Sequence, residues 1–201
     1  MKKILLMGFP STYNYGSGMM GIALIHWLSE KLEETPEFSV LFTDESDYSR
    51  LQNELSEVII SKHMSVSSSS KKYRSSLAKV LNAITTYSNE IKRMTTNVDC
   101  VIYLGGDTLY EGYSKKSLYI TLYKLWLVRK RVPLFLIGQT IQGFSSFRKI
   151  LARIALKNVI LTTRDKASKE YLASIGLRNV KVAADLAFLD LIRQNDEEYL
   201  K

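Results

Sequence analysis

Residues 100–113 read CVIYLGGDTLYEGY, a short apolar run that ends in two glycines and an aspartate. A continuous apolar run bounded by turn residues is typical of a parallel strand that is covered on both faces. Similar runs predict strands at 3–9, 39–43, 57–60, 100–105, 133–138, 159–163 and 180–183. Amphipathic stretches between them predict helices at 18–34, 47–55, 73–94, 115–131, 145–156 and 166–175. This alternation predicts a doubly wound α/β domain with a mostly parallel, Rossmann-like sheet.

Length and composition predict one folded domain over residues 1–190. The chain has 201 residues, of which 46% are hydrophobic, so it can bury a sizeable core. Residues 191–201 are polar and are interpreted as a tail or as the start of an interdomain linker. No apolar run approaches the roughly 20 residues of a membrane span. One cysteine and two histidines give no disulfide or metal pattern, so we expect a reducing, cytoplasmic compartment and no cofactor.

The charge of the chain favours an anionic partner. Twenty-eight basic and 20 acidic residues give a formal net charge of +8, and the cations cluster at 71–74, 92–93 and 129–131. Solvated surface charge is the simplest interpretation. A patch that contacts the anionic inner face of a membrane is the alternative. Nucleic acid is not expected, because no recognisable binding module accompanies the charge.

A glycine motif near the N-terminus resembles a dinucleotide fingerprint but does not fit one. Residues 9–21 read FPSTYNYGSGMMG, and residues 16–21 have the form G-x-G-x-x-G. In the dinucleotide fold, the first glycine closes the strand directly and an acidic residue follows it by about 20 positions. Here eight positions separate Gly8 from Gly16, and the next acidic strand end, Asp44, is too far along. The inserted polar, aromatic loop instead predicts the rim of a ligand cleft.

Polar residues follow several predicted strands, where ligands of such sheets collect. They are Asn14, Asp107, Gln139, Arg164 and Asp185. Structural explanations are available for some: Asn14 for an Asx turn, Arg164 and Asp185 for an ion pair, and Asp165 for a helix N-cap. Asp107 has no evident structural need between a Gly-Gly turn and an aromatic stretch.

Four segments together resemble the polysaccharide pyruvyl transferase family. They are KILLMGFPSTYNYGSG from Lys3, VIYLGGDTLYEGY from Val101, PLFLIGQTIQGF from Pro133 and TTRDKASKEYLASIGLRNVKVAADLAF from Thr162. The resemblance implies an enzyme that transfers a pyruvyl group from phosphoenolpyruvate to a hydroxyl of a cell-surface glycan sugar or lipid-linked glycan. It also implies the N-terminal, acceptor-side half of a GT-B-type transferase, with the second domain absent.

The resemblance also implies roles for the residues at the strand ends. Asp107 is the candidate catalytic residue, which orients or deprotonates the acceptor hydroxyl. The candidate substrate-binding residues are Asn14, Tyr15, Gly16, Gly105, Gly106, Tyr113, Gln139, Arg164 and Asp185. Two alternatives stay open: a GT-B glycosyltransferase half that uses a nucleotide sugar, and a non-catalytic glycan-binding or assembly subunit.

Overall fold

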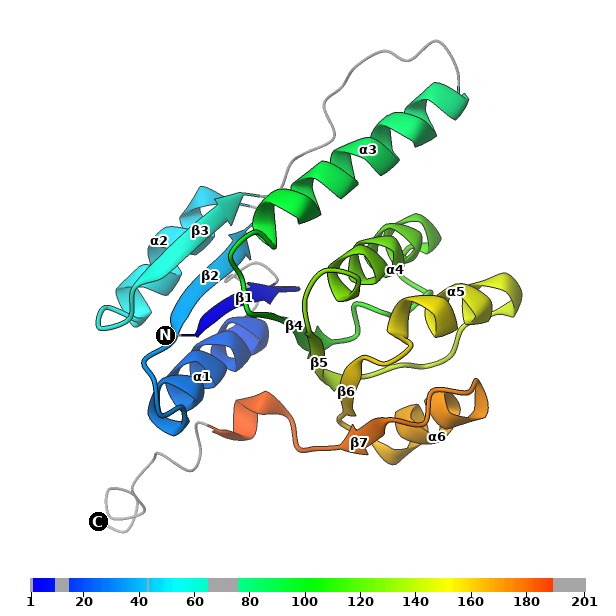
Figure 1. Ribbon diagram of the computed structural model, residues 1–201. Coiled ribbons are helices and arrows are strands. Elements are labelled where there is room, and N and C mark those ends of the chain that lie inside the picture. The colour runs from blue at the N-terminus through cyan, green and yellow to red at the C-terminus, as the bar shows by residue number, and fades with distance from the viewer. Residues whose placement is uncertain (1, 10–14, 43, 65–75, 190–201) are drawn as a thin grey trace.

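The computed structural model describes residues 2–9, 15–42, 44–64 and 76–189 and contains seven strands (Figure 1). The strands are β1 (Lys3–Met7), β2 (Glu37–Phe42), β3 (Ile60–Met64), β4 (Cys100–Gly106), β5 (Leu134–Gln139), β6 (Ile160–Thr163) and β7 (Val180–Val182). The helices are α1 (Tyr15–Lys31), α2 (Glu45–Glu54), α3 (Ser76–Met94), α4 (Lys115–Arg129), α5 (Ser146–Leu156) and α6 (Lys166–Ser174), followed by a 3₁₀ turn, η1 (Leu186–Leu189).

The strands form one sheet in the order β3-β2-β1-β4-β5-β6-β7, and all six neighbouring pairs are parallel. From β1 the chain builds the sheet outward to β3, then crosses back to β4 and builds in the opposite direction. The order therefore reverses between β1 and β4. The doubly wound, Rossmann-like prediction is confirmed, and every described strand is parallel.

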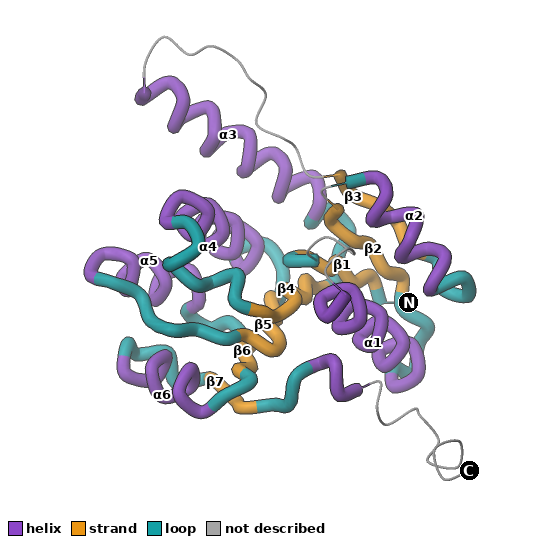
Figure 2. The backbone as a smooth tube through the Cα atoms, turned by 180° about the vertical axis from the view of Figure 1, so that it is seen from behind, coloured by secondary structure: helices purple, strands orange, loops and turns teal. Residues whose placement is uncertain are grey.

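Helices cover both faces of the sheet and enclose two apolar cores (Figure 2). Alternate residues of one strand point to opposite faces. On β1, Leu5 joins the core beneath α3, α4, α5 and α6, whereas Leu6 joins the core beneath α1, α2 and η1. Both leucines are fully buried. Burial on both faces explains why the central strands read as continuous apolar runs.

Most predicted elements are confirmed within a few residues, but the third strand was placed too early. The apolar run at 57–60 predicts a buried strand, whereas β3 is Ile60–Met64. Val58 packs against the α1–α2 core after the end of α2, and Ile59 is 83% exposed. Because β3 is an edge strand, its sequence mixes polar and apolar residues and gives a weak signal.

Candidate functional site

The parallel sheet brings the residues that follow β4, β5 and β6 to one edge. Gly106 is in register with Gln139, and Gln139 with Thr163. The pairing continues past the strand ends, since the Thr140 amide donates to the Gly106 carbonyl at 2.8 Å and the Arg164 amide to the Gln139 carbonyl at 3.1 Å. Asp107, Thr140 and Arg164 therefore occupy equivalent places at the carboxyl edge of neighbouring strands, and Asp107 lies beside the point where the strand order reverses. Ligands of open α/β sheets bind at such a point.

The glycines at the end of β4 permit a close approach of two strands. A Cβ on Gly105 would lie 2.1 Å from the Gly138 carbonyl oxygen of β5, so only glycine fits there. Gly106 has a φ of +128°, a conformation that side chains disfavour, and a Cβ there would have no atom within 4 Å. Gly105 thus serves strand packing, while Gly106 presents its backbone to open space where a ligand can approach.

Asp107 and Tyr113 form an exposed pair on the loop after β4. The Tyr113 hydroxyl donates a hydrogen bond to Oδ2 of Asp107, and Tyr113 is 70% exposed. This bond and the negative charge of Asp107 raise the pKa of Tyr113 above its ordinary value. The other carboxylate oxygen of Asp107 has no partner among the described residues. The carboxylate can accept a proton from a sugar hydroxyl, and the phenol can hydrogen-bond the sugar.

Arg164 is the centre of a second group on the same edge. Its Nη1 lies 2.6 Å from Oδ2 of Asp185, and its Nε and Nη2 donate to Oγ1 of Thr140 at 3.0 and 2.7 Å. The other oxygen of Asp185 accepts from the Ala187 amide at 3.1 Å, which fixes the carboxylate. Arg164 has five N–H donors. Two remain without a partner among the described residues, and its side chain is 29% exposed, so it can still bind an anion.

Gln139 lies behind this edge and is fully buried. Its Nε2 is 3.5 Å from the Tyr103 carbonyl and 3.4 Å from the Ile137 carbonyl, and its buried Oε1 has no partner among the described residues. A direct contact with a sugar would require its surroundings to open. In this conformation Gln139 supports the strand end, and its role in substrate binding stays a prediction.

An ion pair that the sequence did not predict anchors the loop after β4. Oε2 of Glu111 accepts from Nε of Arg148 at 2.7 Å and from the Ser145 amide at 3.0 Å. These bonds lower the pKa of Glu111 to about 2. The pair ties the loop that carries Asp107 and Tyr113 to the first turn of α5. The only signal for this pair in the sequence is the opposite charge of the two residues, which are 37 positions apart.

The predicted site residues of the opening loop are only partly described. Asn14 lies outside the described residues, and so does the side chain of Tyr15. Gly16 is exposed in the first turn of α1. The structure therefore brings together the residues from β4, β5, β6 and the segment after β7, and leaves the role of the opening loop a prediction.

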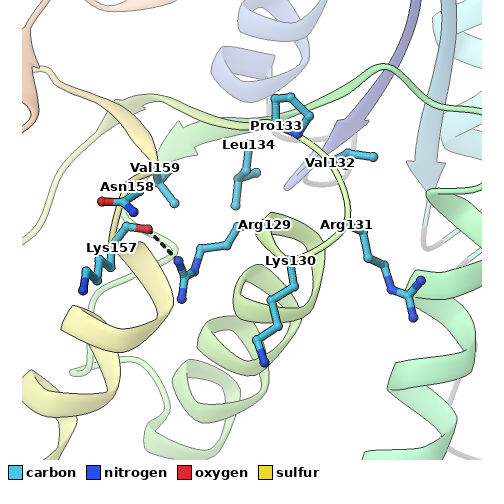
Figure 3. Close-up of a pocket in the computed structure, with 9 residues that line it drawn as sticks. All are labelled: Arg129, Lys130, Arg131, Val132, Pro133, Leu134, Lys157, Asn158 and Val159. Carbon is cyan, nitrogen blue, oxygen red and sulfur yellow. Dashed lines mark hydrogen bonds between the residues drawn. The ribbon is translucent and has the colours of Figure 1, made fainter.

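A cavity of about 200 Å³ lies at the carboxyl ends of β1 and β2, next to Tyr103 of β4. It is lined by Met7, Gly8, Phe9, Leu41, Phe42, Tyr103, Ile120, Thr121 and Lys124. A larger cavity of about 300 Å³ lies at the opposite, amino edge of the sheet (Figure 3). There Nη1 of Arg129 donates to the Lys157 carbonyl at 2.8 Å, while Arg131 points away from that pair. Cations at the C-terminal ends of α4 and α5 offset the helix dipoles, which explains this basic cavity without a ligand.

Metal and membrane features are absent from the part of the chain that the structure describes. Within residues 2–9, 15–42, 44–64 and 76–189, no group of three or more His, Cys, Asp or Glu side chains is placed to hold a metal ion. No helix in those ranges is long and apolar enough to cross a bilayer. Cys100 is a free, half-buried thiol, and burial raises its pKa.

The fold and the edge residues define a class: a Rossmann-like α/β protein whose candidate ligand site lies at the carboxyl edge of a doubly wound sheet. The family model described as polysaccharide pyruvyl transferase matches residues 14–199. The chain belongs to the polysaccharide pyruvyl transferase family. The resemblance inferred from the strand-end motifs is confirmed.

Comparison with solved structures supports the fold. The chain is similar to UDP-GlcNAc 2-epimerase from Neisseria meningitidis, whose crystal structure has UDP-GlcNAc bound, with 14% sequence identity and a TM-score of 0.53. The similarity covers 100% of this chain and 53% of the epimerase chain, so this chain spans about half the length of that protein. Comparison with curated proteins gives no match.

Proposed function

We propose that the protein takes part in transferring a pyruvyl group from phosphoenolpyruvate to hydroxyls of a cell-surface or lipid-linked glycan sugar. The observation that carries the proposal is the exposed Asp107 carboxylate at the carboxyl edge of β4, in a chain whose family is polysaccharide pyruvyl transferase. Residues 1–190 would form the acceptor-side domain of a GT-B-type enzyme. The chain spans about half of the epimerase chain, as one half of a two-domain enzyme would.

The reaction defines what the edge residues would do. A proton adds to the methylene carbon of phosphoenolpyruvate, and two sugar hydroxyls form bonds to its C2 as phosphate leaves. Of the two hydroxyl protons released, one balances the proton added to carbon and the other leaves with phosphate. Asp107 would accept a hydroxyl proton, and Tyr113 would hydrogen-bond the sugar.

Arg164 would bind an anionic group of the bound substrates. Its planar guanidinium suits a carboxylate or a phosphate, and Thr140 and Asp185 fix its direction. Gly106 would let the substrate approach the backbone, and Asn14, Tyr15 and Gly16 would complete the rim from the opening loop. Gln139 would hold the end of β5 in place, or contact the sugar after a local opening.

The cellular setting follows from the same proposal. Phosphoenolpyruvate is a cytoplasmic metabolite, so the enzyme would act in the cytoplasm. A lipid-linked acceptor would bring it to the inner face of the membrane, and the net charge of +8 suits that anionic surface.

Two donor assays test the reaction. The protein is incubated with phosphoenolpyruvate, and separately with nucleotide sugars, in the presence of cell-envelope glycans, and release of phosphate or nucleotide is measured. We expect glycan-dependent phosphate release. Nucleotide release would instead favour a glycosyltransferase. This alternative is tested because the epimerase of similar fold binds a nucleotide sugar, UDP-GlcNAc. Glycan binding with neither release would favour a non-catalytic subunit.

A further inference from the structure

Helix α5 carries an exposed cationic stripe. Lys149, Arg153 and Lys157 follow one another at intervals of four residues, so they lie on one side of the helix and its end. All three are exposed, and none forms an ion pair with another described residue. Arg148 differs from them, because it points to Glu111 and is largely buried in that ion pair.

An apolar stripe runs beside the cations. Phe147, Ile150 and Ile154 have helical spacing and are 61%, 52% and 48% exposed. Ile150 and Ile154 line a groove of about 420 Å³ between α5 and the turn after α6, together with Arg153, Lys157, Gly176 and Leu177. Helix α5 lies at the margin of the molecule, between α4 and α6 (Figures 1 and 2).

The segment of sequence that contains α5 has no acidic residue. Residues 112–164 contain no Asp or Glu, yet they contain Lys115, Lys116, Lys124, Arg129, Lys130, Arg131, Arg148, Lys149, Arg153, Lys157 and Arg164. The rest of the chain is slightly acidic, because it holds all 20 acidic residues and only the remaining basic ones. The positive net charge of the protein therefore comes from the segment that includes α5.

We propose that the outer face of α5 is a docking surface for the anionic lipids of a membrane. Cations beside exposed Phe and Ile side chains are the combination by which an interfacial helix binds a bilayer: the apolar groups enter the headgroup boundary and the cations contact phosphates. The apolar stripe distinguishes this surface from one that is merely basic. A partner that is acidic but not apolar would leave these three side chains in water, whereas a bilayer buries them. This surface would bring the enzyme to a lipid-linked acceptor, and in that respect the proposal rests on the proposed function.

Vesicle flotation without substrate tests this surface independently of activity. The protein is mixed with phosphatidylcholine vesicles that contain phosphatidylglycerol, or with phosphatidylcholine alone, at about 0.15 M and about 1 M salt, where the Debye length falls from about 8 to about 3 Å. We expect flotation only with the anionic vesicles, and weaker flotation at the higher salt. The variant Lys149→Gln/Arg153→Gln/Lys157→Gln should reduce binding at least tenfold, and so should Phe147→Ser/Ile150→Ser/Ile154→Ser.

Two control variants keep the test specific. Lys166→Gln/Lys169→Gln removes two exposed cations from α6, and Leu81→Ser/Ile84→Ser removes exposed apolar groups from α3; both should float like the parent protein. Circular dichroism verifies that all variants are folded. Absence of flotation at low salt overturns the proposal, and so does unchanged binding of both α5 variants. Loss of self-association in the apolar α5 variant, with no vesicle binding by the parent, would show that a second copy covers this face and would also overturn it.

Discussion

At the scale of single residues, Arg164 links the structural and the functional parts of the candidate site. Thr140 and Asp185 hold its guanidinium by three hydrogen bonds, and two of its five N–H donors have no partner among the described residues. Because the planar guanidinium is already held in one orientation, it loses less conformational entropy when it binds an anion.

Replacing Arg164 by Lys should therefore impair catalysis although the charge is kept. An ammonium group cannot contact Thr140, Asp185 and a substrate with the same geometry, so we expect kcat/KM for phosphoenolpyruvate to fall at least tenfold, a loss of about 1.4 kcal/mol or more. Steady-state kinetics measures it, and Lys166→Gln, a change to an exposed cation on α6, serves as the control. Equal kcat/KM values for the Arg164→Lys variant and the parent would remove Arg164 from the site.

Gly105 gives a second prediction at this scale. A Cβ at this position would meet backbone of β5, which cannot move aside as a side chain can. We expect Gly105→Ala to lower the free energy of unfolding by about 1–3 kcal/mol. The denaturant midpoint measures the change. Gly106→Ala is the informative comparison, because a Cβ there meets open space and its cost is only that of a disfavoured φ. Equal stability of Gly105→Ala and the parent would contradict the close strand approach.

At the scale of elements, helix α6, which follows the strand that ends beside Arg164, is fixed at its first turn. Asp165 caps α6, since its Oδ1 accepts from the Ser168 amide at 2.6 Å and its Oδ2 from the Ser168 hydroxyl at 2.7 Å. The Ser168 oxygen in turn accepts from the Ile141 amide at 2.9 Å. The cap of α6 thereby also positions the chain that follows β5.

Replacing Asp165 by Ala should cost about 1 kcal/mol of stability. Asp44 caps α2 by the same kind of bond to the Ser46 amide, but it is exposed and forms no bond to a second segment among the described residues. We therefore expect Asp165→Ala to shift the denaturant midpoint more than Asp44→Ala does, with unchanged m-values. A larger midpoint shift for Asp44→Ala than for Asp165→Ala would show that the bond between Ser168 and Ile141 does not depend on the cap.

The Glu111–Arg148 pair predicts how the loop after β4 responds to acid. The folded-state pKa of Glu111 is lowered from 4.5 to about 2, so its stabilising contribution is fully present above pH 4.5 and is lost as the pH falls through about 2. An NMR titration of the Glu111 carboxyl should give a pKa near 2 in the parent protein. In Arg148→Gln it should move back toward 4.5. A value near 4.5 in the parent would show that the loop is not anchored through this pair.

At the scale of the whole molecule, alternating short apolar runs and amphipathic stretches were enough to predict the doubly wound fold. The candidate edge was predictable too, because every parallel strand sends its carboxyl end the same way.

Other features of the site were not predicted. Thr140 was not among the predicted site residues, although it directly follows β5 as Asp107 directly follows β4. The bond between Glu111 and Arg148 could not be predicted, since it depends on how the loop folds back onto α5. The burial of Gln139 could not be predicted either, because a polar residue at the end of a strand is normally expected to be exposed.

The most direct test of the central claim is phosphate release from phosphoenolpyruvate by the parent protein and by Asp107→Asn, with cell-envelope glycans as acceptors. The asparagine keeps the shape and can still accept the Tyr113 hydrogen bond, but it cannot take a proton from a sugar hydroxyl. We predict glycan-dependent release by the parent and a rate about 10² to 10⁴ times lower in the variant, the usual contribution of a general base. Release by Asp107→Asn at the rate of the parent would contradict the assignment of catalysis to this edge of the sheet.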